Sequence, residues 1–142
     1  MTLPKVVLLL AFAVAFMTEA AWAGHDSGGG APSDGVTLEM ITTNLAREPG
    51  QEGRLIQVGI QLKLGDPKEA ETVKAYMPKI RSEILYTLCD HTAASLSSGQ
   101  SRIALLEELQ NTVNTVLGGK KGKRGKIEGP VEEVLFTYFL IP

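Results

Sequence analysis

The sequence contains very little cysteine and histidine. Among its 142 residues there is one cysteine, Cys89, so a disulfide framework within one copy is excluded and the hydrophobic core must hold the fold. Cys89 lies in a helical pattern, which favours a small buried side chain, with an intermolecular disulfide as the alternative. The two histidines are His25, which stands beside Asp26, and His91. This is too little for a metal pattern, and we expect neither a metal site nor another cofactor.

The sequence also lacks a large excess of charge of either sign. The formal net charge is −2 and 21% of the residues are charged, which argues against a nucleic-acid-binding protein and against disorder by composition. Cys89 and His91 are two positions apart in a helical pattern, so their side chains point about 200° apart and cannot act as a pair. No other catalytic constellation is visible. We therefore expect a protein that is not an enzyme and has no small-molecule substrate.

An apolar run stands near the N-terminus. It covers Val6 to Phe16 and is preceded by Lys5. Ala21 and Ala23 supply the small side chains that signal peptidase requires, which predicts cleavage before Gly24. The alternative is an uncleaved membrane anchor, although a spanning helix needs about 20 apolar residues. Under both interpretations residues 1–23 act as a signal peptide or short anchor, and the rest of the chain is exported.

The exported part divides into a tether and one domain. Residues 24–35 are rich in Gly, Ser, Asp and Pro and predict a flexible tether. Residues 36–142 are enough for a single core.

Two strands are predicted first. One covers Val36 to Leu45, with Val36, Leu38 and Met40 on one face. The other covers Arg54 to Leu64, where apolar and polar residues alternate strictly. The polar turn between them, residues 47–53, predicts a hairpin.

Two amphipathic helices are expected to follow. Asp66 can cap the first helix, with Pro67 at its first position, and Pro78 predicts a kink or break near Met77. The second helix is predicted from Gln100 to Leu117, ending at Gly118. The apolar stripes that face the core are Val73, Met77, Ile80, Ile84 and Leu88 in the first, and Ile103, Leu106, Leu109, Val113 and Leu117 in the second.

A glycine-rich basic loop, residues 118–129, precedes the last strand. Its cations are Lys120, Lys121, Lys123, Arg124 and Lys126. We interpret it either as a solvated linker or as a segment attracted to an acidic surface of a membrane or a protein. No Gly-Lys-Ser/Thr ending is present, so a nucleotide-binding loop is not supported.

The predicted strand from Val131 to Ile141 is apolar on both faces. Such a strand is usually interior or covered by a partner, so Phe136 and Phe139 are candidate interaction residues. The predicted order is β-β-α-α-β. It indicates an α+β fold in which two helices pack on a small antiparallel sheet.

Six short segments in this order resemble the FliL family of flagellar basal-body-associated proteins. The resemblance runs from about Val36 to Ile141. The segments are Asn44-Leu45, Leu55 to Pro67, Met77 to Leu85, Thr92 to Leu96, Leu105 to Leu109 and Val134 to Phe139.

The resemblance implies an inner-membrane-associated protein with a periplasmic domain similar to the stomatin/SPFH fold. It implies a non-enzymatic accessory of the flagellar motor that supports swimming, swarming and chemotactic movement by contacting stator units and further copies of itself. The predicted signal cleavage site favours an alternative, which is a soluble periplasmic adaptor or binding module of the same fold that is not tied to the flagellum.

Overall fold

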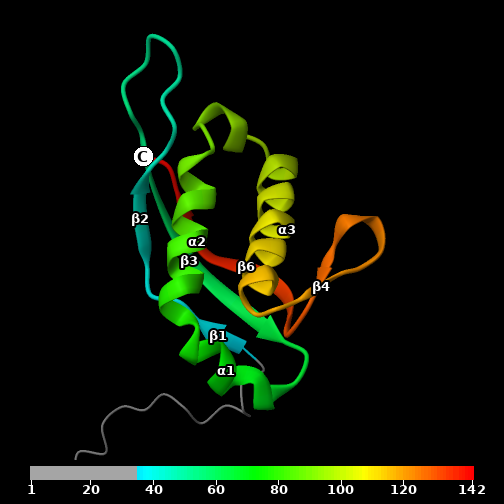
Figure 1. Cartoon of the computed structure of the whole chain (residues 1–142). Coiled ribbons are helices and arrows are strands. Elements are labelled where there is room, and N and C mark those ends of the chain that lie inside the picture. Colours follow the sequence, from blue (N-terminus) through cyan, green and yellow to red (C-terminus); the bar gives the residue numbers. More distant parts are fainter. Residues whose placement is uncertain (1–34) are drawn as a thin grey trace, which may run out of the picture. The chain divides into compact units, whose positions relative to one another are not determined.

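The computed structural model describes residues 35–142, and the predicted signal and most of the predicted tether lie outside these residues. The fold is α+β, as expected: helices cover one face of a small antiparallel sheet (Figure 1). The main elements are β1 (Gly35–Thr37), β2 (Ile41–Asn44), β3 (Leu55–Leu64), α1 (Ala70–Ala75), α2 (Met77–Cys89), α3 (Gly99–Val116), β4 (Lys120–Lys121), β5 (Ile127–Glu128) and β6 (Val131–Leu140).

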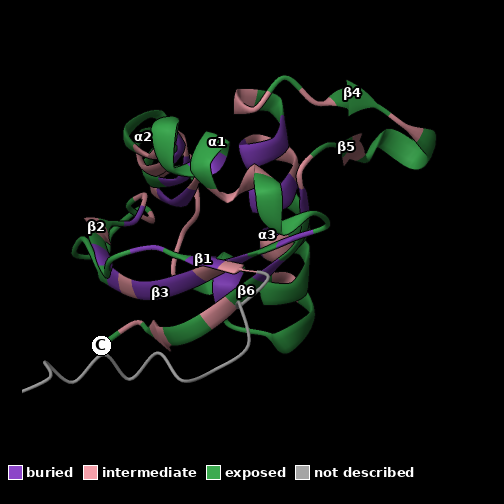
Figure 2. Ribbon diagram, turned by 90° about the horizontal axis from the view of Figure 1, so that it is seen from below, coloured by how far each residue is buried: buried purple, intermediate pink, exposed green. Residues whose placement is uncertain are grey.

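Strand β3 lies at the centre of the sheet. Both β1 and β2 pair with one edge of β3, and β6 pairs with the other, all antiparallel. The predicted alternation along β3 is confirmed, because Ile56, Val58, Ile60, Leu62 and Leu64 are each at most 3% exposed. These side chains form the floor of the core beneath the helices, and the buried positions along β3 are visible in Figure 2.

The predicted first strand is divided in two. From Thr37 to Ile41 the chain advances four residues, whereas β3 advances only three between their partners Val58 and Gln61. The extra residue reverses the side-chain alternation, as a bulge does. Ile41 is therefore buried, and Met40 is 52% exposed, so the placement of Met40 on the inner face was wrong.

Proline and capping residues set the helix boundaries as expected. Asp66 accepts a hydrogen bond from the Lys68 backbone N–H at 2.9 Å, and Pro67 follows it in a short 3-10 turn. Pro78 lies in the first turn of α2, and the chain breaks at Tyr76 into α1 and α2 because proline cannot donate within a continuous helix. The described residues thus contain three α-helices where two were expected. Gly118 follows α3 with a φ of 78°, a conformation that favours glycine.

The inward face of α3 is rotated from the predicted one. Ile103, assigned to the core, is 52% exposed, whereas Leu105 is buried together with Leu109 and Val113. The rotation also buries two polar side chains, Gln110 and Asn114, toward β6. The burial of these amides cannot be predicted from apolar spacing, because that reasoning places every polar residue on the solvent-facing side of the helix.

Asn114 links α3 by hydrogen bonds to the start of β6. Its Nδ2 donates to the carbonyls of Val131 (2.8 Å) and Ile127 (3.0 Å), and its Oδ1 accepts from the Val131 N–H (2.9 Å). Gln110 adds bonds to the carbonyls of Val131 and Glu132. Asn114 has no solvent exposure, and its two bonds to Val131 are fully buried.

We predict that Asn114→Ala lowers the free energy of unfolding by about 2–4 kcal/mol, because it removes three hydrogen bonds and leaves the buried Val131 N–H without a partner. Chemical denaturation measures the loss. The control is Thr115→Ala on the exposed side of the same helix, which should change stability by less than about 0.5 kcal/mol. Equal stability of the two variants would contradict the anchoring role.

Candidate functional site

The polar side chains of the described domain do not gather into a reactive centre. Among residues 35–142 no three His, Cys, Asp or Glu side chains are arranged to hold a metal ion. His91 Nε2 lies 2.8 Å from Glu108 Oε2, whereas Cys89 Sγ lies 3.3 Å from Thr43 Oγ1. The cysteine and the histidine therefore have separate partners, as their spacing predicted. Cys89 is half-buried, which is less than the expected full burial.

Within residues 35–142 no helix combines the length and the apolar character needed to cross a membrane. The residues of the predicted cleavage site, Ala21, Ala23 and Gly24, lie outside the described part of the chain.

Phe136 and Phe139 lie on the helix-facing side of β6. Both are half-buried against the core, and their rings meet edge to face with centroids 5.1 Å apart. The Arg102 guanidinium lies 4.6 Å from the centre of the Phe139 ring. Positions three apart share a face here because the β3–β6 register shifts between Gly59 and Ile60. The two phenylalanines thus support the fold.

Gly59 makes this irregularity sterically feasible. A Cβ atom at this position would lie 2.5 Å from Thr137 Oγ1 and 3.3 Å from Tyr138 Cβ. Glycine thus allows β6 to approach the centre of β3 closely at the bulge.

The opposite, outward side of the sheet carries an apolar row. Leu135, Tyr138 and Leu140 on β6 are 38%, 42% and 39% exposed, and Leu55 on β3 is 44% exposed. Among residues 35–142 strand β6 pairs only with β3, so its other edge has no strand partner. We call these four residues the outer apolar row. Sequence reasoning missed all four. For the three on β6 the reason is that the bulge, which separates them from the phenylalanines, leaves no mark in an apolar run.

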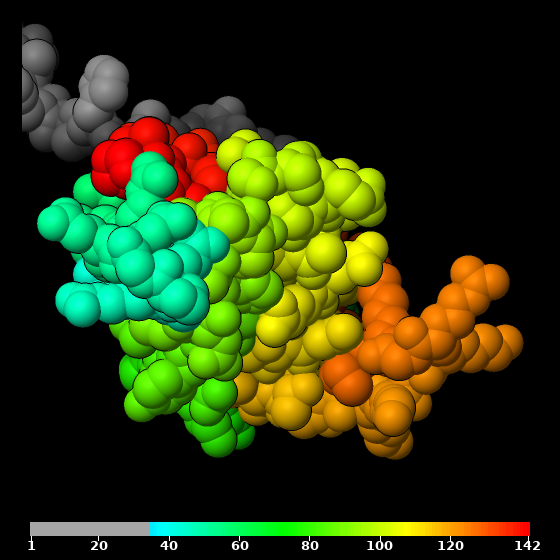
Figure 3. All heavy atoms as spheres, turned by 90° about the horizontal axis from the view of Figure 1, so that it is seen from above, coloured from blue at the N-terminus to red at the C-terminus, as the bar shows by residue number. Residues whose placement is uncertain are grey.

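The glycine-basic segment forms a short hairpin in place of a linker. Strands β4 and β5 pair Lys120 with Glu128 and Lys121 with Ile127. The turn between them places Arg124 at a φ of 58° and Gly125 at a φ of 77°. We call residues 120–128 the basic hairpin. It projects from the body of the domain beside α3 (Figures 1 and 3).

Two asparagines of α3 hold the base of the basic hairpin. Asn111 Oδ1 accepts a hydrogen bond from the Ile127 N–H at 2.8 Å, and Asn114 binds the carbonyl of the same residue. The five cations of the hairpin are all exposed, and none forms an ion pair with a carboxylate of residues 35–142. The structure therefore combines an ordered backbone with unpaired positive charge.

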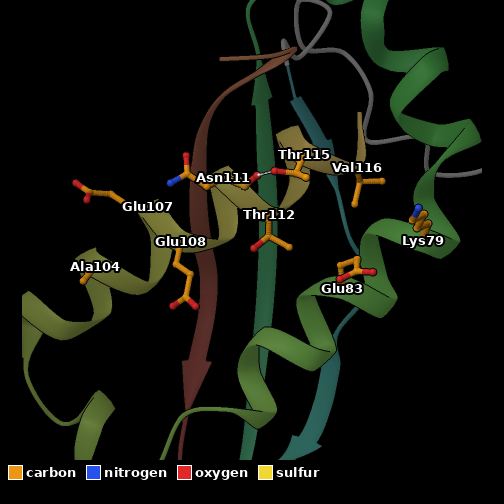
Figure 4. A pocket seen from close by; sticks show the side chains of 9 residues that line it. All are labelled: Lys79, Glu83, Ala104, Glu107, Glu108, Asn111, Thr112, Thr115 and Val116. Atoms are coloured by element: carbon orange, nitrogen blue, oxygen red, sulfur yellow. Dashed lines mark hydrogen bonds between the residues drawn. The ribbon is translucent and has the colours of Figure 1, made fainter. Parts of the chain in front are cut away.

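An open groove of about 650 Å³ runs between α2 and α3 (Figure 4). Its carboxylates are Glu83 from α2 and Glu107 and Glu108 from α3, with Lys79 as the single cation. Asn111, Thr112 and Thr115 add neutral polar groups along α3. We call this the helix groove. Its lining combines acidic and hydroxyl groups, and Glu108 is also the partner of His91, which is not part of the lining.

Comparison with known proteins agrees with the resemblance seen in the sequence. The family model described as "Flagellar basal body-associated protein FliL" matches residues 36–141. Curated relatives include the "Flagellar protein FliL" of Escherichia coli strain K12, of Escherichia coli O157:H7 and of Shigella flexneri, each 29% identical over 104 residues. The aligned region covers 73% of this chain and 62% of each relative, so the chain spans about three fifths of their length.

We predict that Phe136→Asp or Phe139→Asp lowers the free energy of unfolding by about 2–4 kcal/mol, since each places a charge against the core. Tyr138→Asp on the outward face is the matched control and should cost less than about 1 kcal/mol. Thermal and chemical denaturation of the three variants checks this. A larger loss in Tyr138→Asp than in the phenylalanine variants would reverse the assignment of the two faces.

Proposed function

The chain belongs to the FliL family of flagellar basal body-associated proteins, and we propose that it supports flagellum-driven motility through contacts with motor stator units and with further copies of itself. Family membership gives it an accessory role at the flagellar basal body. The proposed action is mechanical and non-enzymatic: the domain holds or positions neighbouring proteins. Swimming, swarming and chemotactic movement then depend on the contacts that its surface makes.

The outer apolar row is the observation that carries this proposal. Exposed apolar side chains beside an unpaired strand edge are a common place for another chain to bind, because the strand offers free backbone N–H and C=O groups there. Here the four apolar side chains of the row are between 38% and 44% exposed, and three of them are on β6, whose other edge has no strand partner among residues 35–142. We assign this face to a protein component of the motor, with the stator unit as the proposed partner.

The proposed location is the periplasm, next to the inner membrane and the basal body. Residues 36–142 form the functional domain in this proposal, with a stomatin/SPFH-like fold. Residues 1–23 direct export and are either cleaved before Gly24 or retained as a short anchor. N-terminal sequencing of the protein from separated periplasmic and membrane fractions distinguishes these two forms.

We predict that deletion of the gene reduces swimming and swarming and that complementation restores both. A fluorescent fusion to the C-terminus should form foci at flagellar bases. Normal motility of the deletion strain together with diffuse fluorescence would refute the proposed function and favour the adaptor that is not tied to the flagellum.

We predict that Leu135→Ser combined with Tyr138→Ser abolishes basal-body foci and lowers motility, because it removes apolar surface from the proposed contact. Its unfolding free energy should fall by less than about 1 kcal/mol, since both side chains are exposed. Thr37→Ser on the same outward side of the sheet serves as the control and should behave as the unchanged protein. Foci and motility that persist in the double variant would remove this face from the contact.

A further inference from the structure

The basic hairpin combines unpaired positive charge with an ordered backbone, which suits it to bind an acidic surface. The hairpin contains five cations and only one carboxylate, Glu128. None of the five cations has an ion-pair partner in residues 35–142. Its backbone is nevertheless ordered, by the β4–β5 pairing and by the bonds of Asn111 and Asn114 to Ile127. An element that is already ordered loses little conformational entropy when it binds, so its charges are available for contact at low cost.

The hairpin projects away from its own domain, so a binding partner for its cations would be another molecule. It extends past the helices and away from the body of the domain (Figures 1 and 3). Asn111 both lines the helix groove and holds the hairpin base, so the two features are neighbours in one copy. No cation of the hairpin comes within ion-pairing distance of the groove carboxylates in that copy.

The helix groove has the complementary charge. Three carboxylates and one amine line it, and Glu83 and Glu107 have no ion-pair partner within residues 35–142. Its volume of about 650 Å³ falls within the range of ligand-sized clefts, about 300–1,000 Å³. The amide and hydroxyl oxygens of Asn111, Thr112 and Thr115 are further acceptors for lysine and arginine N–H groups.

We propose that the basic hairpin of one copy docks in the helix groove of a second copy, with Lys123 and Arg124 facing Glu83 and Glu107. This proposal rests on the self-contact that is part of the proposed function. Because the two surfaces differ, the contact is heterologous, and repeating it builds a closed ring or an open filament. The outer apolar row, on the other side of the sheet, remains available to the motor partner.

An anionic membrane is the competing partner for five cations. Segments that lie in a membrane interface usually combine cations with apolar or aromatic side chains that enter the lipid. The hairpin turn, residues 122–125, has only glycine and charged residues, and Ile127 is half-buried at the base. A groove of opposite charge on the same molecule therefore favours a second copy.

A charge exchange between two variants of the full chain tests the docking. The hairpin variant is Lys123→Glu with Arg124→Glu, and the groove variant is Glu83→Lys with Glu107→Lys. Each variant places like charges at the proposed contact, between positions 123 and 124 of one copy and positions 83 and 107 of the next, which weakens its self-association. In a mixture, the acidic turn of the hairpin variant meets the basic groove of the groove variant, and the reverse pair is complementary as well.

The measurement is sedimentation velocity of the full chain in mild detergent at about 150 mM salt, where surface charges act over about 8 Å. Each variant alone should associate at least about tenfold more weakly than the unchanged protein, and the equimolar mixture should recover most of the loss. Arg47→Glu with Lys68→Glu makes the same change in net charge as the hairpin variant, at two exposed positions that belong neither to the basic hairpin nor to the groove lining. This control should associate as the unchanged protein does.

Three outcomes overturn the docking: association of the hairpin variant at full strength, a mixture that stays as weak as its components, or an unchanged protein that is monomeric. Flotation with vesicles of phosphatidylglycerol and phosphatidylcholine tests the lipid alternative. Loss of vesicle binding in the hairpin variant, together with association at full strength, is the first of these outcomes and assigns the hairpin to lipid instead. The deletion strain tests the proposed function separately, so reduced motility together with a mixture that fails to associate refutes the docking alone.

Discussion

The pairing of β3 on both edges is the constraint on which the other elements depend. Its five inward side chains are almost fully buried, so the helices must cover that face, and β1, β2 and β6 must follow its register. Any irregularity in a neighbour then changes which side chains reach the core. The two most consequential irregularities are the extra residue between Thr37 and Ile41 and the bulge of β6 opposite Gly59. The second one separates the core phenylalanines from the outer apolar row.

Buried amides of α3 connect this core to the charged periphery. Asn114 satisfies backbone groups at the start of β6 and also binds the hairpin base, so the same side chain serves stability and the position of the basic hairpin. Directional hydrogen bonds suit this purpose, because apolar packing alone would not define the angle at which a short hairpin leaves the domain. The molecule thereby presents three separate surfaces: an apolar row, a basic hairpin and an acidic groove.

Much of the fold was predictable from local chemistry. The alternation in β3, the cap at Asp66, the break that Pro78 imposes and the helix stop at Gly118 all depend on nearby residues and were confirmed. The candidate site was predicted less well. Its cations were identified, but the segment that holds them was not recognised as a hairpin. Phe136 was named as a candidate interaction residue, and it packs against the core, whereas Leu135, Tyr138 and Leu140 of the same strand are exposed.

The sequence by itself determined the class of fold, the central strand, the helix boundaries and the resemblance to a flagellar family, because these follow from periodicity, from Pro and Gly chemistry and from ordered motifs. Only the tertiary structure decided which faces are inside. Met40 and Ile103 turn outward because a bulge and a rotated helix place them there, and Asn114 turns inward because backbone groups distant in sequence need partners. Such choices depend on residues that approach one another only in the folded chain. The hairpin and the groove therefore became recognisable as complementary surfaces only in three dimensions.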